Sequence, residues 1–274
     1  MEFKMAVYGQ RIFGHMKVIQ DLLKKQNKNL EFLPCEDIST IFQNLQEHEK
    51  QGLKHILIHP CLVDDLFSHF HQMPDFVRKS QYMDCLIYDG KIWWPHVALF
   101  ETLRELMVGR GRKMDLRSWG YVTGHSSLAR LSVILLADLG FRRIRWVVEN
   151  PIFVDKMVTE LQASFFGCEI EIVPSKSLTL LGNDGSVLIN TFACGGENSI
   201  NQDLYFLNFM VSDSLIVDLE GDPLPSQLAQ EAIQVGHRVL RGDEVFFSTV
   251  LNFLNKKMNW EFSMEEALKE WRGQ

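Results

Sequence analysis

Short apolar runs alternate with longer segments of helical period along both halves of this chain, and this alternation limits the folds open to it. The first half predicts a strand at 4–8, a helix at 16–25, a strand at 31–34, a helix at 38–51 and a strand at 55–59. Pro60 follows the last of these runs, as expected at the end of a buried strand. Such alternation predicts a parallel sheet covered by helices, and therefore an α/β fold.

The alternation restarts after an interruption in the middle of the chain. Asp89-Gly90 indicates a turn between two apolar runs, and a helix over 97–108 and a linker over 109–117 follow it. The second half then predicts strands at 119–123, 144–148, 170–173, 187–190 and 215–218, with helices at 127–139 and 153–165. Two domains joined near residue 112 are the simplest account.

Charge and cysteine content exclude several functional classes. The net charge of −7 disfavours nucleic acid or an anionic membrane as the main partner, because phosphate binding needs clustered Lys and Arg. Five cysteines without a Cys-x-x-Cys pair argue against a disulfide framework or a structural zinc site. We see no signal peptide, and the longest apolar stretch is too short to span a bilayer. We expect a cytoplasmic protein that binds a small molecule, and the sequence leaves its oligomeric state open.

The sequence Gly124-His-Ser-Ser-Leu-Ala129 lies between an expected strand and an expected helix, where a dinucleotide-binding turn belongs. That turn uses a first Gly to bend sharply, a second Gly beside the pyrophosphate and a third small residue for helix–strand packing. Gly124 and Ala129 suit the first and third roles, whereas Ser126 occupies the second. Taken by itself, this match is weak.

Further runs give the match specificity. Ala129-Arg130 is followed in order by Leu188-Ile-Asn-Thr191, Val217-Asp218 and Val239-Leu-Arg-Gly242. Their order and spacing resemble those of the nucleotide-binding domain of the shikimate dehydrogenase family. The resemblance implies two α/β domains. These are a substrate-type domain at 1–112, completed by helices from 246–274, and a Rossmann-like NAD(P)-binding domain at 113–245.

The catalytic positions implied by the resemblance carry other residues. In the family a Lys and an Asp handle the proton that moves as hydride passes between substrate and nicotinamide, and a titratable side chain is needed for that step. Here the two positions fall on Leu62 and Ala98, neither of which can transfer a proton. If our alignment has slipped, Lys17 with Asp64 or Asp65 would be the nearest replacement pair by position.

The implied substrate-binding positions have changed as well. They fall on Phe13, His15, Ile56, Ile58, His96 and Thr249. A site built to hydrogen-bond a ligand discriminates strongly against one that leaves its groups unpaired. We therefore expect this chain to bind shikimate poorly, with His15, His96 and Thr249 as the polar residues left in the substrate pocket.

The implied cofactor positions are better preserved. Gly124, Ser126, Ser127, Asn190 and Thr191 are the expected cofactor-binding residues, together with Glu149. Glu149 stands 25 residues after Gly124, where an acidic side chain suits a ribose 2′-hydroxyl and repels a 2′-phosphate. NAD is therefore favoured over NADP if a dinucleotide binds. The alternative is that Glu149 only caps a surface loop.

Two further groups of residues allow a functional and a structural interpretation. His15, His59 and His96 could together bind a metal or supply a general base, but isolated histidines are more often fillers of a core or surface, and we predict no metal site. Trp93-Trp94-Pro95 could form an aromatic wall for a flat ligand, although packing at a strand end is the commoner role.

Three functions remain open on the sequence. The favoured hypothesis is a divergent protein of shikimate dehydrogenase type that keeps the dinucleotide scaffold and acts on, or only binds, a ligand other than shikimate; such a protein could be a pseudoenzyme. The second is a working NAD(P)-dependent oxidoreductase of shikimate or quinate type. The third is a non-catalytic interaction protein with an empty nucleotide site.

Overall fold

The computed structural model describes residues 2–63, 66–110, 114–191, 207–219, 224–258 and 263–273. The chain divides into two compact units, the first made of Met1–Leu99 with Phe247–Gln274 and the second of Phe100–Phe246. The first unit combines helices with a mixed sheet and the second with a parallel sheet, which confirms the predicted two-domain α/β class. The units meet in sequence at residues 99 and 100, whereas the sequence placed the boundary near residue 112.

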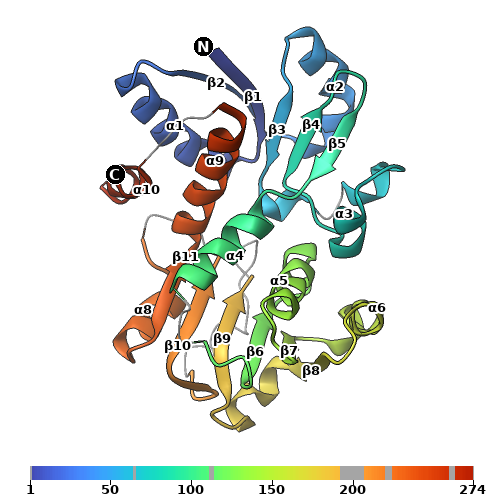
Figure 1. The fold of residues 1–274 in the computed structure, drawn as a ribbon, viewed down its shortest axis with the longest axis vertical. Coiled ribbons are helices and arrows are strands. Elements are labelled where there is room, and N and C mark those ends of the chain that lie inside the picture. Colours follow the sequence, from blue (N-terminus) through green and yellow to red (C-terminus); the bar gives the residue numbers. More distant parts are fainter. Residues whose placement is uncertain are drawn as a thin grey trace. The chain divides into compact units, whose positions relative to one another are not determined.

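The sheet of the first unit has, within the described residues, five strands in the order β2-β1-β3-β4-β5 (Figure 1). Its strands are β1 (Glu2–Tyr8), β2 (Asn29–Cys35), β3 (His55–Ile58), β4 (Cys85–Tyr88) and β5 (Trp93–His96). β1 pairs in parallel with β2 and β3, and β4 and β5 continue the sheet in antiparallel pairs. The predicted parallel core and the Asp89-Gly90 turn are therefore confirmed.

Helices from both ends of the chain complete the first unit. They are α1 (Gln10–Lys25), η1 (Ile38–Thr40), α2 (Ile41–Lys50), η2 (Pro60–Leu62), η3 (Phe67–His69), α3 (Asp75–Ser80), α9 (Gly242–Met258), whose first residues fall in the second unit, and α10 (Met264–Arg272). The C-terminal helix α10 packs against α1, where Lys25 Nζ lies 2.8 Å from Glu270 Oε2. The C-terminal segment is therefore an integral part of this unit.

The sheet of the second unit has, over the residues the structure describes, six parallel strands in the order β11-β10-β9-β6-β7-β8. Its strands are β6 (Trp119–Thr123), β7 (Arg143–Val148), β8 (Glu169–Pro174), β9 (Gly185–Asn190), β10 (Met210–Asp218) and β11 (Arg238–Arg241). Counted from β6, this is the 3-2-1-4-5-6 arrangement of a Rossmann sheet. The order in which the chain adds strands to the sheet changes sides between β6 and β9, and ligands of such folds bind at the carboxyl ends of those two strands.

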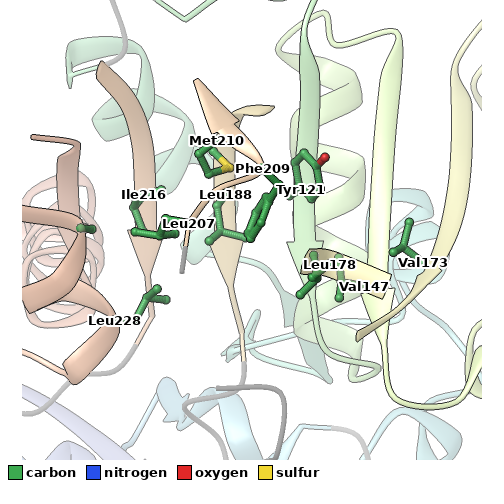
Figure 2. Packing of buried hydrophobic residues seen from close by; sticks show 11 residues of the cluster. Tyr121, Val147, Val173, Leu178, Leu188, Leu207, Phe209, Met210, Ile216 and Leu228 are labelled. Atoms are coloured by element: carbon green, nitrogen blue, oxygen red, sulfur yellow. The ribbon is translucent and has the colours of Figure 1, made fainter. Parts of the chain in front are cut away.

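Helices cover the second sheet on two faces. The helices of this unit are α4 (Leu99–Arg110), α5 (Ser127–Asp138), η4 (Pro151–Phe153), α6 (Asp155–Ser164), η5 (Ser175–Leu180) and α8 (Gln227–Gln234). Gly120 faces α5 so closely that an added Cβ would lie 2.8 Å from Leu136. Tyr121, the next residue along the strand, points to the other face, because side chains alternate along a strand. There it joins the buried cluster of Figure 2, whose members include Leu178, Phe209 and Leu228.

Two predicted helices begin with a short 3-10 segment. The helix expected at 38–51 starts as η1, where the Asp37 carboxylate accepts a hydrogen bond from Ser39 N at 2.9 Å. The helix expected at 153–165 starts as η4, where Asn150 accepts one from Ile152 N at 3.1 Å and Pro151 fixes the first φ. Such local side-chain caps compete with the α-helical pattern at a helix start.

The start of α4 is capped by a residue distant in sequence. Asp84 is buried, and its carboxylate accepts hydrogen bonds from Ala98 N at 2.6 Å and Leu99 N at 2.8 Å. Burial raises the pKa of Asp84 to about 6, although the two hydrogen bonds act in the opposite direction. A tertiary cap of this kind has no local sequence signature.

His55 makes the stability of the first unit dependent on pH. Its ring lies between Phe3 and Phe253, at centroid distances of 5.0 and 5.3 Å, and burial lowers its pKa to about 4, with smaller contributions from Lys257 and Lys54. The unfolded chain takes up a proton at His55 near pH 6.5, whereas the folded chain does so only near pH 4. The folded state therefore loses stability relative to the unfolded state as pH falls from about 6.5 to about 4.

We predict that His55→Phe reduces the loss of unfolding free energy between pH 7 and pH 4.5 by about 2 kcal/mol. Urea unfolding at both pH values measures this, and equal losses for both proteins would contradict it.

Candidate functional site

The turn after β6 is built around a glycine whose backbone no other residue adopts easily. Gly124 has φ +106°, and a Cβ placed on it would collide with Thr191 Oγ1. The same Cβ would lie 3.7 Å from the Cβ of Ala129, so the small side chain of Ala129 lets the helix start close to the strand. The roles predicted for Gly124 and Ala129, a sharp turn and close packing, both fit this geometry.

Both backbone polar groups of Gly124 are bonded within the protein. Gly124 N donates to Val147 O at 3.1 Å, and Gly124 O accepts a hydrogen bond from the indole Nε1 of Trp146 at 2.6 Å. Trp146 belongs to β7 and is fully buried. The turn is thus held to the neighbouring strand through both of these groups.

Ser126, in the place of the second glycine, is the N-cap of α5. Its φ and ψ are −77° and 171°, and its hydroxyl accepts a long hydrogen bond of 3.4 Å from Ala129 N. Ser127 opens the helix and is buried. The positive end of α5 faces the carboxyl edge of the sheet and suits an anion there. The Ser126 hydroxyl already occupies one of the donors that an anion would otherwise use.

A row of polar side chains crosses the carboxyl edge of the sheet. Thr123 Oγ1 donates to Asn190 Oδ1 at 2.7 Å, and Asn190 Nδ2 donates to Asp218 Oδ1 at 2.9 Å. Asp218 in turn accepts a hydrogen bond from Ser226, the N-cap of α8. The residues of adjacent strands in this row are direct register partners. Their hydrogen bonds fix which way the amide of Asn190 faces.

Thr191 completes the contact between β6 and β9. Its Oγ1 donates to Thr123 O at 2.5 Å and lies against Gly124. Like Asn190, it is almost fully buried. The structure therefore brings together Gly124, Ser126, Ser127, Asn190 and Thr191 at the carboxyl ends of β6 and β9, and the side chains of Asn190 and Thr191 brace the turn there.

Glu149 follows β7 directly, one strand away from the turn, and is exposed. The next residue, Asn150, caps η4. Beside them the ring of His125 lies 5.1 Å from that of Phe153, and Ile152 is 79% exposed. An acidic side chain, an aromatic pair and an exposed aliphatic residue thus flank the Gly124 turn.

In the first unit, His15 is part of a cluster of aromatic rings. Its ring centroid lies 4.2 Å from that of Trp271 in α10 and 5.0 Å from that of Phe247 in α9. Trp271 also covers Gly14, where an added Cβ would lie 2.9 Å from the indole. His15 is 5% exposed, so this ring packs against the C-terminal helices.

His96 and Thr249 occupy different surroundings. His96 ends β5 and is exposed, and partial desolvation followed by the charges of Lys257 and Lys256 lowers its pKa. Thr249 lies in α9 and is buried. Among the described residues, no group of three or more His, Cys, Asp or Glu side chains converges as a metal site would require.

No protein-family model matches this sequence, and no curated protein matches it. Solved structures do. Shikimate 5-dehydrogenase from Thermus thermophilus, in complex with shikimate, has 14% sequence identity and a TM-score of 0.79, over 99% of this chain and 100% of that one. Shikimate dehydrogenase from Aquifex aeolicus has 12% identity and a TM-score of 0.76, over 99% and 98% of the two chains.

This chain has the shikimate dehydrogenase fold. The predicted resemblance of fold is therefore confirmed over essentially the whole chain. Among the described residues, no helix has the length and hydropathy needed to cross a membrane.

Leu62 and Ala98, on which the sequence resemblance places the family's catalytic pair, both make contacts within the protein. Leu62 ends η2, and its Cδ1 would lie 3.2 Å from a Cβ on Gly9. Ala98 joins β5 to α4, and its backbone N–H is bonded to Asp84. Of the substitute pair considered above, Lys17 lies exposed on α1. Asp64 and Asp65 lie outside the described residues.

Sequence reasoning did not single out Trp146 or Ser226. Trp146 could be recognised as an inward-facing strand residue from the alternation along β7, but its reach to Gly124 O depends on the pairing of two strands. Ser226 precedes a helix, which is a recognisable N-cap signal, while its bond to Asp218 is a tertiary contact. Contacts between distant segments are the part that one sequence does not reveal.

We predict that Gly124→Ala lowers the free energy of unfolding by about 2–3 kcal/mol, because the new Cβ meets Thr191 and the positive φ disfavours any L side chain. Gly182→Ala is the matched control. Gly182 lies in the same unit, has no positive φ and has open space around it, so its change should stay within about 0.5 kcal/mol. Chemical unfolding of both variants tests this, and a Gly124→Ala variant as stable as wild type would refute it.

Proposed function

We propose that this chain is a dinucleotide-binding protein that lacks a proton-transfer pair for shikimate and does not oxidise it. The observation that carries the proposal is the Gly124 turn, with its positive φ, at the carboxyl ends of β6 and β9. In a Rossmann sheet this is the place where the pyrophosphate of a dinucleotide meets a helix N-terminus. Structures of the same fold are described in complex with NADP(H) and shikimate, and with shikimate and NAD.

The proposal that this chain does not oxidise shikimate is supported by the residues at the positions that the resemblance assigns to the catalytic pair. Leu62 and Ala98 carry no titratable group, and a hydride transfer from a hydroxyl needs one within hydrogen-bond distance. His15 supports the same conclusion, since its ring packs against Trp271 and Phe247. The ligand of the first unit would then differ from shikimate, and its identity is the open part of the proposal.

NAD is the favoured dinucleotide. Glu149 is exposed directly after β7, the second strand of the nucleotide-binding unit in chain order. A carboxylate there accepts hydrogen bonds from ribose hydroxyls and repels a 2′-phosphate. His125 and Phe153 add a ring pair on the same side of the turn, against which a base can stack.

The second candidate is a working oxidoreductase of shikimate or quinate type. The observation in its favour is the likeness itself, which extends over both chains to an enzyme in complex with shikimate and NADP(H) at a TM-score of 0.75. For this candidate, other residues such as Lys17 would have to supply the proton-transfer group. A turnover assay separates the two candidates.

We predict that Glu149→Arg reverses the dinucleotide preference. Wild type should bind NAD more tightly than NADP, and the variant should favour NADP, with each Kd ratio moving by about tenfold or more because an Arg pairs with the 2′-phosphate. Isothermal titration calorimetry with both cofactors measures this. Glu169→Arg makes the same charge change at the amino end of β8, whereas Glu149 follows the carboxyl end of β7. This control should leave the preference unaltered. Binding of neither cofactor by wild type would refute the proposed function.

We further predict that shikimate is not oxidised with either cofactor. Loss of general acid–base groups reduces rates by about 10²–10⁴-fold, and the changed polar positions reduce binding further. Formation of reduced nicotinamide, followed by absorbance, is the measurement, with the Thermus thermophilus shikimate 5-dehydrogenase as positive control. Turnover comparable to that enzyme, and abolished by Lys17→Ala, would establish the second candidate instead.

A further inference from the structure

Trp146 reaches the Gly124 turn from the neighbouring strand. It lies in β7 opposite Val122, is 0% exposed, and donates its Nε1–H to Gly124 O over 2.6 Å. An indole has a single donor, and here that donor is bonded to one backbone carbonyl. The carbonyl belongs to the peptide that joins Gly124 to His125, the first peptide of the turn.

The direction of that carbonyl determines the direction of an N–H group. In a trans peptide the C=O and N–H bonds point in opposite directions, because the unit is planar. With Gly124 O directed at the buried indole, the N–H of His125 is directed away from it. His125 is exposed and immediately precedes the N-cap Ser126 of α5. Its N–H therefore joins the donors of a helix N-terminus, which bind phosphate oxygens.

A glycine cannot hold this orientation alone. Gly124 has no Cβ, so the peptide that follows it can rotate at lower steric cost than at any other residue. Its other polar group, the N–H bonded to Val147 O, lies in the preceding peptide and does not fix the following one. Among the hydrogen bonds seen within the described residues, the bond from Trp146 is the one that holds the Gly124 carbonyl.

We infer that Trp146 is a positioning residue for dinucleotide binding, which acts by turning the His125 N–H toward the pyrophosphate. The inference rests on the proposed function, because it needs a dinucleotide at the Gly124 turn. Trp146 itself does not touch the ligand, since it is completely buried. Its effect should appear in affinity and in the environment of one amide.

The test uses the full-length chain and two variants. Trp146→Phe removes the indole donor and keeps an aromatic ring in the core. Trp119→Phe is the matched control, since Trp119 is in β6 of the same unit and packs over the Arg145 guanidinium at 4.1 Å, at the opposite end of the strand from the turn. NAD is the probe, and calorimetry gives its Kd together with the fraction of sites that are active.

We predict that Trp146→Phe weakens NAD binding about tenfold, equivalent to 1.4 kcal/mol, while Trp119→Phe leaves it unchanged. A second readout reports the peptide itself. The chain has nine histidines, so ¹⁵N-histidine labelling gives few backbone signals, and His125→Gln assigns the one that matters. In the ligand-free Trp146→Phe protein that signal should be displaced, and the displacement should be absent from Trp119→Phe.

A third protein distinguishes loss of the indole N–H from a folding defect in Trp146→Phe. Replacing Trp146 with β-(3-benzothienyl)alanine exchanges the N–H for sulfur and keeps the ring shape, and it should reproduce the loss of affinity. Wild-type affinity in the folded Trp146→Phe and benzothienyl proteins, or an equal loss in Trp119→Phe, would overturn the inference while leaving the proposed function intact. Failure of wild type to bind either NAD or NADP would overturn both.

Discussion

The close contact between Gly124 and Thr191 is the constraint on which the second unit depends. It brings the carboxyl end of β6 against that of β9, the two strands where chain order reverses across the sheet. Any side chain at Gly124 would separate them, because a Cβ would meet Thr191 Oγ1. The hydrogen bonds that cross the edge of the sheet from Thr123 to Asn190 and Asp218 reinforce the same contact. Because buried polar groups are costly unless they are paired, this row stabilises one arrangement of three strand ends.

Positions that resemble a polar substrate site serve packing in the first unit. The ring of His15 packs against those of Trp271 and Phe247, and Leu62 lies against Gly9. Aromatic stacking and apolar contact stabilise a fold without holding a polar ligand. A site that loses its hydrogen-bonding groups loses discrimination for its original ligand, since binding no longer leaves buried groups unpaired when the wrong molecule enters. The fold of the first unit therefore does not depend on a polar ligand being held at these positions.

The sequence predicted the fold class and the order of elements far better than the contacts. Apolar periodicity predicted the α/β class, and the turn at Gly124, together with the later runs that resemble the shikimate dehydrogenase family, predicted a Rossmann-like unit. The assignment of Leu62 and Ala98 to the family's catalytic positions stays a prediction. The bond from Trp146 to Gly124, the capping of α4 by Asp84 and the burial of His15 could not be predicted, because each joins segments that only the folded chain brings together. Tertiary contacts decide whether a residue at a site position faces a ligand or a neighbour.

A residue that holds the geometry of a turn and a residue that only transfers a proton are under different structural constraints. Gly124, Thr191 and Asn190 determine the geometry of the strand ends, so replacing them costs folding free energy whether or not a cofactor is bound. A proton-transfer group contributes to a reaction and little to stability, so the fold constrains such a position less. The geometry of the Gly124 turn therefore serves the fold as well as the proposed binding of a dinucleotide. Ser126 also serves the fold, because its hydroxyl caps α5 by accepting a hydrogen bond from Ala129 N. A pyrophosphate at the helix N-terminus would compete for that donor.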